Sequence, residues 1–312
     1  MSESAIEPIS LWLFHSDPAA FAGALGASFA RHGFAVVSDH GLDQARQNAA
    51  VEDAKAFFAL SDPVKRRYHI VGGAGQRGYT PLRTETAKGA AQADLKEFWH
   101  IGRDLPPGHR FAVDMPDNVW PSEISGFRES QTWLFDALEH LGEVLLAAIA
   151  RYLSLDPTNL ADATAQGNSV LRLIHYPPTT GVGEGVRAGA HEDINAITLL
   201  LGAEEAGLEI LDRDGRWLAI HPPPDAVVVN IGDMLARLTN DVLPSTTHRV
   251  VNPTPERAGV ARYSTPFFLH FRPDFLIKTL PGCLTPEWPN RYPTPILASD
   301  FLAQRLREIK LA

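Results

Sequence analysis

The segment AGAHEDINAITLL (residues 188–200) places three ionisable side chains in a stretch whose other residues predict a buried strand. Burying such groups is unfavourable unless they are paired or bind a ligand. Because side chains alternate along a strand, His191 and Asp193 are expected to face one side and Glu192 the other. The pair could therefore bind one metal ion. A zinc-protease motif would need a second histidine at position 195, which is Asn195, so this motif is excluded.

A third metal ligand is available in the segment STTHRVVNP, where His248 follows His191 by 57 residues on another predicted strand. Two histidines and one carboxylate on one face of a six-coordinate ion leave three positions open. Such a donor set suits Fe(II) that binds dioxygen together with a chelating oxo-acid. We therefore predict that His191, Asp193 and His248 form a catalytic metal site.

An oxo-acid co-substrate such as 2-oxoglutarate carries a second, distal carboxylate that needs a cation. The tripeptide RYS supplies Arg262 and Ser264 at alternate positions of a predicted strand. The arginine offers a bidentate fork and the serine a hydroxyl donor to the same anion. Tyr176, in the segment IHYPP, could donate a further hydrogen bond from a neighbouring strand. The predicted co-substrate contacts are therefore Arg262, Ser264 and Tyr176.

The elements that must position these residues change in character near residue 168. Residues 1–167 contain three helical patterns, in SDPAAFAGALGASFARHG, over residues 42–70 and in a long leucine-rich stretch, with an irregular segment from Gly72. Residues 168–312 contain short β-rich segments separated by Gly, Pro and Asp, followed by a final helix, SDFLAQRLREIKL. This pattern predicts a mainly β fold with flanking helices, in which a jelly-roll core and the N-terminal region form one structural unit.

Composition restricts the classes of partner. The chain has 312 residues and a formal charge of −9, which argues against a nucleic-acid partner. No apolar run is long enough to predict a membrane span, and Met1–Ser10 lacks the features of a signal peptide. A single cysteine, Cys283, excludes an intramolecular disulfide and a cysteine-based zinc site. We expect a cytoplasmic protein with a small-molecule substrate, and the sequence predicts no oligomeric state.

Further residues are candidates for the substrate cavity or for structural roles. The predicted cavity residues are Arg77, Tyr79, Phe98, His100, Arg172 and Phe268. Phe267 and Phe268 are not expected to face the cavity together, because strand neighbours alternate. His175, His221 and His270 are expected to be structural, with His270 as an alternative cavity residue, and Asp233 is expected to serve a turn. A mixture of arginine, histidine and aromatic residues indicates a small, polar substrate, for which a carboxylate is one option.

The chain resembles the isopenicillin N synthase-like branch of the 2-oxoglutarate/Fe(II)-dependent dioxygenases over nearly its whole length. The resemblance rests on SFARHGFAVVSDHGL, DLKEFWHIG, LRLIHYPP, GAHEDINAITLLL, VVVNIGDML, LTNDVLPSTTHRVVNP and RYSTPFF. It implies a double-stranded β-helix with helices packed against one sheet. It also implies that His191, Asp193 and His248 bind the metal and that Arg262, Ser264 and Tyr176 contact 2-oxoglutarate.

Two positions depart from the family pattern. Many plant members have an asparagine two residues before the tyrosine of the Tyr-Pro-Pro motif, whereas this chain has Ile174. The separation of 14 residues between His248 and Arg262 exceeds the usual family spacing by about one turn, which makes Arg257 a weaker rival of Arg262.

The function that these residues predict is a non-haem Fe(II) oxygenase. It would couple O₂ and 2-oxoglutarate decarboxylation to the hydroxylation, desaturation or cyclisation of a small molecule. A first alternative is the same iron site acting without 2-oxoglutarate or converting 2-oxoglutarate itself to ethylene. A second alternative is a non-enzymatic, cupin-like protein that binds a metal or a small molecule.

Overall fold

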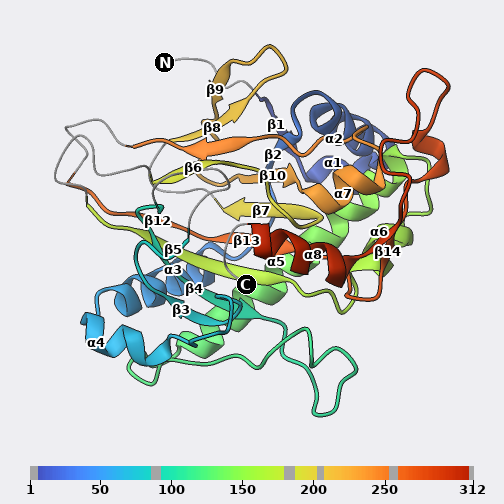
Figure 1. Cartoon of the computed structure of the whole chain (residues 1–312). Helices are drawn as coiled ribbons and strands as arrows, with labels where there is room; N and C mark the ends of the chain where they lie inside the picture. The colour runs from blue at the N-terminus through green and yellow to red at the C-terminus, as the bar shows by residue number, and fades with distance from the viewer. Residues whose placement is uncertain (1–5, 86–92, 179–186, 202–206, 253–258, 309–312) are drawn as a thin grey trace.

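The computed structural model of the chain describes residues 6–85, 93–178, 187–201, 207–252 and 259–308 (Figure 1). Within these residues, the strands form two main sheets, one of nine strands and one of four. In spatial order the larger sheet contains β1 (Pro8–Ser10), β2 (Phe34–Ser38), β10 (Val227–Ile231), β7 (Ile197–Leu201), β13 (Pro266–Leu269), β5 (Val170–Tyr176), β4 (Glu97–Gly102) and β3 (Gly78–Thr80), with β12 (Arg262–Ser264) also paired with β5. The smaller sheet contains β6 (Ala188–His191), β11 (His248–Val250), β8 (Leu208–Leu211) and β9 (Trp217–Ala219).

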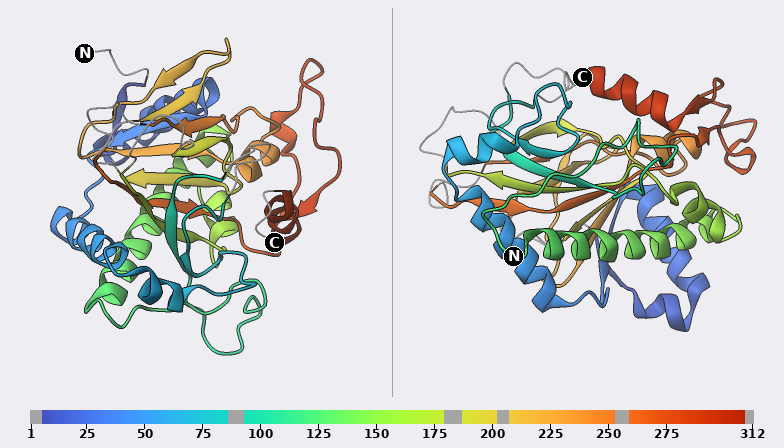
Figure 2. Two further views of the ribbon diagram at one scale, coloured as in Figure 1. Left: turned by 60° about the vertical axis from the view of Figure 1, so that its left-hand side comes forward. Right: turned by 90° about the horizontal axis from the view of Figure 1, so that it is seen from below.

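Five helices gather on one side of the larger sheet, as the right view of Figure 2 shows. They are α1 (Trp12–Ser16), α2 (Pro18–His32), α3 (Gln44–Phe58), α5 (Phe127–Tyr152) and α6 (Thr158–Thr164). The short helix α4 (Asp62–Lys65) follows α3, and α7 (Asp233–Leu238) and α8 (Ala298–Glu308) lie at one end of the sheets. A short ribbon of β14 (Leu276–Ile277) and β15 (Ile296–Leu297) precedes α8. The prediction of a jelly roll, or double-stranded β-helix, with flanking helices is confirmed.

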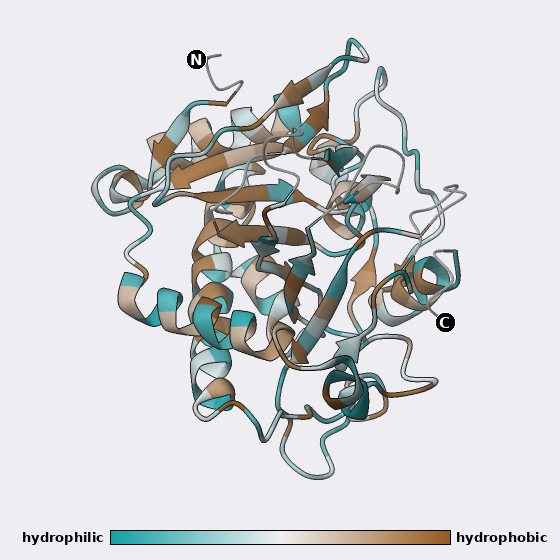
Figure 3. Cartoon of the chain, turned by 90° about the vertical axis from the view of Figure 1, so that its left-hand side faces the viewer, coloured by the Kyte–Doolittle hydropathy of each residue, from teal (hydrophilic) through white to brown (hydrophobic). Residues whose placement is uncertain are grey.

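Local sequence explains the two helices that carry most of the packing. Asp17 caps α2 by accepting the N–H of Ala20, Pro18 occupies the first turn, and Gly33 ends the helix with a φ of 68°. The regular apolar positions of α5 are buried against α2, β7 and β13. Phe135 of α5 meets Phe267 of β13 edge to face, with ring centroids 5.0 Å apart. Figure 3 shows that the central strands are mostly hydrophobic and the peripheral connections mostly hydrophilic.

The segment predicted to be irregular contains two strands of the larger sheet, β3 and β4. All six residues of β4 are buried, so this strand lacks the alternation of apolar and polar residues that marks a half-buried strand. The short helices α6 and α7 were also not predicted. The boundary placed between residues 167 and 168 remains a prediction, although two strands from before it pair with strands that follow it, β2 with β10 and β4 with β5.

Candidate metal centre

Three potential ligand atoms converge where β6 of the smaller sheet ends and β11 begins. His191, Asp193 and His248 each offer one atom, and the three atoms lie within 4.8 Å of one another. The Oδ1 atom of Asp193 is 3.9 Å from Nε2 of His191 and 3.8 Å from Nε2 of His248. Two imidazoles and a carboxylate on one face form the donor set expected for Fe(II), so these residues fit that ion.

Strand pairing explains how residues so far apart in sequence come together. His191 ends β6 and His248 begins β11, and the two are direct partners across this antiparallel pair. Their ring centroids are 4.4 Å apart. Asp193 lies beyond the end of β6, so the prediction that it shares a strand with His191 is wrong. Its carbonyl accepts the N–H of Asp233 at the start of α7, instead of continuing a β ladder.

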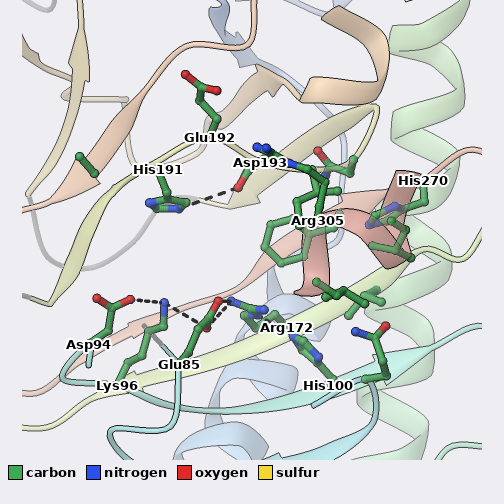
Figure 4. A pocket seen from close by; sticks show the side chains of 18 of the residues that line it. Glu85, Asp94, Lys96, His100, Arg172, His191, Glu192, Asp193, His270 and Arg305 are labelled. Carbon is green, nitrogen blue, oxygen red and sulfur yellow. Dashed lines mark hydrogen bonds and ion pairs between the residues drawn. The ribbon is translucent and has the colours of Figure 1, made fainter. Parts of the chain in front are cut away.

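Glu192 lies outside this group of donors, as predicted. Its side chain is exposed, points away from the cavity floor in Figure 4 and accepts a hydrogen bond of 2.9 Å from Thr247 Oγ1. Since β6 ends at His191, the orientation of Glu192 is set by the loop that follows the strand. Alternation along a strand had predicted the same outward orientation for a different reason.

The hydrogen bonds of the two histidines leave Nε2 free to bind a cation. Nδ1 of His191 lies 2.7 Å from the carbonyl of Gly189, and Nδ1 of His248 lies 3.1 Å from that of Thr246. A carbonyl accepts only, so each Nδ1 carries the proton. Burial, with His248 nearby, lowers the pKa of His191 to about 4, which keeps this imidazole neutral near pH 7.

Two side chains of the larger sheet hold the other oxygen of Asp193. Thr198 Oγ1 and Asn230 Nδ2 donate to Asp193 Oδ2 at 2.5 and 2.8 Å, and the two donors are direct partners across β7 and β10. Burial alone would raise the pKa of Asp193, but the histidines and these hydrogen bonds lower it below its ordinary value. Neither donor was predicted from the sequence, although Asn230 is a polar residue within the apolar segment VVVNI.

A narrow pocket of about 70 Å³ extends from the metal donors between the two sheets. Arg262, Ser264 and Tyr176 line it, and all three are less than a tenth exposed. Arg262 and Tyr176 are direct partners across β12 and β5, and the guanidinium lies 5.1 Å from the centre of the tyrosine ring. Ile174, at the position where the family resemblance implies an asparagine, also lines this pocket. The rival Arg257 lies outside the described residues.

A larger cavity of about 360 Å³ lies on the other side of the metal donors (Figure 4). Five residues line both spaces, namely Lys96, Arg172, His191, Asp193 and Phe268. The remaining wall of the larger cavity comes from Gln76, Glu85, Asp94, His100, Val170, Ala190, Glu192, Ile194, Asn195, Thr247, His270, Leu302, Arg305 and Leu306. We call this space the outer cavity. Its position beside the donors suits a substrate that must approach the metal.

Buried ion pairs form the floor of the outer cavity. Lys96 Nζ lies 2.8 Å from Asp94 and 3.2 Å from Glu85, and Arg172 lies 3.1 Å from Glu85. Burial opposes these charges, but the two carboxylates raise the pKa of Lys96, and the two cations lower the pKa of Glu85. Lys96 and Glu85 are therefore both charged near neutral pH.

The predicted cavity residues divide between the cavity and the core. His100, Arg172 and Phe268 line the cavity, and Phe98 stacks behind Arg172 with its ring centre 4.3 Å from the guanidinium carbon. Arg77 and Tyr79 are buried elsewhere and do not line the outer cavity, so the prediction fails for these two residues.

The other histidine, phenylalanine and aspartate residues singled out in the sequence lie partly in the cavity wall and partly away from it. Phe267 packs in the core while Phe268 faces the cavity, as strand alternation predicted. His270 lines the cavity, which was the alternative expectation. His175 Nδ1 donates a 2.7 Å hydrogen bond to the Glu97 carboxylate away from the cavity, and Asp233 begins α7.

The contributions of α8 and of the acidic residues on the cavity floor were not predicted from the sequence. Leu302, Arg305 and Leu306 of α8 line the outer cavity, and Arg305 pairs with Asp233 at 2.5 Å. The signal available in the sequence was the amphipathic pattern of SDFLAQRLREIKL, which predicts a helix but not the surface that it covers. Among the described residues, no helix is both long and apolar enough to cross a membrane.

Comparison with known proteins identifies similar families and structures. A family model described as "2OG-Fe(II) oxygenase superfamily" matches residues 167–271, and one described as "non-haem dioxygenase in morphine synthesis N-terminal" matches residues 6–123. A 2-oxoglutarate-Fe(II) type oxidoreductase of Emericella nidulans is 32% identical over 87% of this chain and 79% of its own length.

Two solved structures extend this similarity. A 2OG-Fe(II) oxygenase family protein from Caulobacter crescentus is 62% identical with a TM-score of 0.92, covering 98% of this chain and 100% of that one. A full-length Neurospora crassa protein in complex with alpha-KG and thymine is 28% identical with a TM-score of 0.86, covering 97% and 96%. These relatives do not favour an iron site without 2-oxoglutarate, an ethylene-forming reaction or a non-enzymatic cupin-like protein.

Proposed function

The chain belongs to the 2OG-Fe(II) oxygenase superfamily, and from this premise we propose which of its residues perform each part of the reaction. The protein is a dioxygenase that uses Fe(II), 2-oxoglutarate and O₂ to oxidise a small molecule. In our proposal, Nε2 of His191, Oδ1 of Asp193 and Nε2 of His248 hold the iron. When bound, ferrous iron supplies the centre at which O₂ is reduced as 2-oxoglutarate is decarboxylated to succinate and CO₂.

The observation that carries this assignment is the orientation of the three donors. Each histidine has its Nδ1 proton directed to a carbonyl, and Asp193 has Oδ2 held by two donors, so that the remaining three atoms face one point. The chain therefore fixes the ligands before a metal binds, which reduces the reorganisation needed on binding.

The narrow pocket is the proposed site of 2-oxoglutarate. Arg262 would pair with the distal carboxylate through its fork of N–H groups, and Ser264 would donate its hydroxyl to the same group. Tyr176, on the strand that pairs with β12, would donate a further hydrogen bond. Apolar side chains such as Val228 and Leu208 line the rest of the pocket and exclude water from the carbon chain.

The outer cavity is the proposed site of the primary substrate. Its volume of about 360 Å³ suits a small molecule. Thymine, which is bound with alpha-KG in the similar Neurospora crassa structure, is a molecule of this size class. We further propose that the chain belongs to the isopenicillin N synthase-like branch, because its motifs resemble those of that branch. Its composition and single cysteine support a location in the cytoplasm.

The assignment is tested by anaerobic absorbance spectra and by succinate formation. Addition of 2-oxoglutarate to the Fe(II) protein should produce a visible charge-transfer band and, with O₂ and substrate, succinate. His191→Ala and Asp193→Ala should lose both signals. Glu192→Ala, which changes the residue between them, should keep the absorbance band. Iron-dependent succinate formation that is unchanged in His191→Ala or Asp193→Ala would refute the assignment.

A further inference from the structure

The cations on the floor of the outer cavity are already neutralised by carboxylates of the chain. Lys96 and Arg172 form ion pairs with Asp94 and Glu85, and none of these four side chains is more than 14% exposed. An anionic substrate that paired with either cation would have to displace a carboxylate and leave it buried without its partner, which is strongly unfavourable. The floor is therefore poorly suited to a carboxylate or phosphate group.

The acidic partners are also fixed by main-chain contacts. Asp94 Oδ1 accepts the N–H of Gly189 on β6 at 3.2 Å, and the carbonyl of Glu85 accepts the N–H of Asp94 at 3.0 Å. Moving the Asp94 carboxylate aside would break its hydrogen bond to β6, the strand that carries His191. This coupling resists a rearrangement that would release a cation for an anionic ligand.

The third cation of the cavity wall is paired as well. Arg305 of α8 lies 2.5 Å from Asp233 and 2.9 Å from Glu308. The wall beside it is apolar, with Leu302 and Leu306 from the same helix. The positive charge of Arg305 is thus already neutralised and does not favour binding of an anion at this wall.

His270 has the property expected of a residue that binds a substrate. Its side chain lines the outer cavity, the residue is 7% exposed, and its Nδ1 has no hydrogen-bond partner among the described residues. Burial lowers the pKa of His270 to about 4, so the ring is neutral near pH 7 and offers one donor and one acceptor. Gln76, whose carboxamide also combines donor and acceptor, lines the same cavity.

We propose that the outer cavity binds an uncharged amide or imide and that His270 is a specificity-determining residue that hydrogen bonds to it. The inference rests on the proposed function, which makes this cavity the substrate site. An amide or imide presents both N–H and C=O groups, which match the neutral imidazole and the carboxamide. It also leaves the ion pairs of Lys96 and Arg172 intact.

Matched probes that differ in one charge test the proposal. The Fe(II) and 2-oxoglutarate-loaded protein is titrated without O₂ with benzamide, benzoate, uracil-6-carboxamide and uracil-6-carboxylate, and the dissociation constants are measured calorimetrically. Each bound uncharged probe should bind at least about tenfold more tightly than its carboxylate partner. Carboxylates that bind as tightly as their partners, or no binding of either uncharged probe up to about 10 mM, would overturn the proposal.

Variants of the floor test the role of the ion pairs. Glu85→Gln keeps the size of the side chain but removes the negative charge beside Arg172. Benzoate should therefore bind to this variant at least about tenfold more tightly than it binds to the wild type. Adding Arg172→Met to Glu85→Gln removes the cation as well and should restore the preference for benzamide. A benzoate affinity that does not respond to Glu85→Gln would contradict the proposal.

Variants of histidine test the specific contact. His270→Phe keeps a ring in the wall but removes both nitrogen atoms, and should weaken binding of the uncharged probes about tenfold or more. His32→Phe replaces a half-buried histidine of α2, away from the cavity wall, and serves as the matched control. Equal probe affinities in the two variants would exclude His270 as a specificity-determining residue.

The probe titration needs no turnover, so its outcome is distinguishable from failure of the proposed function. A reversed charge preference in an enzyme that still forms succinate through His191, Asp193 and His248 would refute only the substrate inference. Loss of the metal and 2-oxoglutarate assignments, with the preference for uncharged probes unchanged, would refute only the proposed function.

Discussion

The hydrogen bonds to Asp193 Oδ2 allow a quantitative test of how the chain prepares its metal site. Thr198 and Asn230 donate at 2.5 and 2.8 Å from neighbouring strands, and both are less than a tenth exposed. Removing either donor in Thr198→Val or Asn230→Leu leaves a buried carboxylate oxygen with one hydrogen bond fewer. A hydrogen bond to a charged group contributes about 1.5–3 kcal/mol.

This free energy converts to a measurable loss of metal affinity. Since about 1.4 kcal/mol is a tenfold change, each variant should bind Fe(II) about 10–100-fold more weakly than the wild type. Affinity is measured on the metal-free protein, without O₂, by competition with a chromogenic chelator. Circular dichroism establishes that each variant is folded.

A second threonine near the site provides the control. Thr247 donates to Glu192 at 2.9 Å but does not contact Asp193, so Thr247→Val should keep the Fe(II) affinity within about twofold of the wild type. If Thr198→Val and Thr247→Val have the same affinity, the reasoning that Asp193 is held in place by its Oδ2 donors is wrong.

Three further predictions concern the co-substrate, pH and helix packing. Arg262→Lys, which replaces a bidentate fork by a single ammonium, should weaken 2-oxoglutarate binding about 10–100-fold in an anaerobic spectral titration, and unchanged affinity would contradict the assignment. Because burial lowers the pKa of His270 in the folded protein to about 4, the unfolded chain takes up a proton first as pH falls below its ordinary value of 6.5, and stability is lost between these two values. Urea unfolding should therefore show the wild type losing about 2 kcal/mol more than His270→Phe between pH 8 and pH 5, and equal losses would contradict this. Gly26→Ala places a Cβ 2.1 Å from the Tyr152 ring and should lower the unfolding free energy by about 1–3 kcal/mol, whereas Gly23→Ala in the same helix meets no atom within 4 Å and should not lower it.

Periodic patterns predicted much of the fold. The helices α2 and α5 were recognisable because each has one buried face, and the later strands because turn residues separate them. The strand β4 was not predicted because all its residues are buried, including Glu97 and His100, whose polar side chains pair inside the protein. Polar residues of this kind resemble a loop in sequence until their partners are known.

Part of the candidate site could be predicted because residues of suitable types lie close together in the sequence. The pairs His191 with Asp193 and Arg262 with Ser264 are each separated by one residue, and their residue types suit a metal and an anion. The contacts of Thr198, Asn230 and Lys96 could not be predicted in this way. Their roles depend on partners brought near by the pairing of strands, which a single sequence does not specify.

The three proposed metal ligands also connect the two sheets. His191 and His248 belong to the smaller sheet, whereas Asp193 is anchored to β7 and β10 of the larger one. A bound cation would thus crosslink the smaller sheet to the larger one. Its removal should loosen β6 and β11, with faster amide exchange there, while β7 and β13 remain protected by α5. In this protein the catalytic ion would also stabilise the packing of the two sheets against each other.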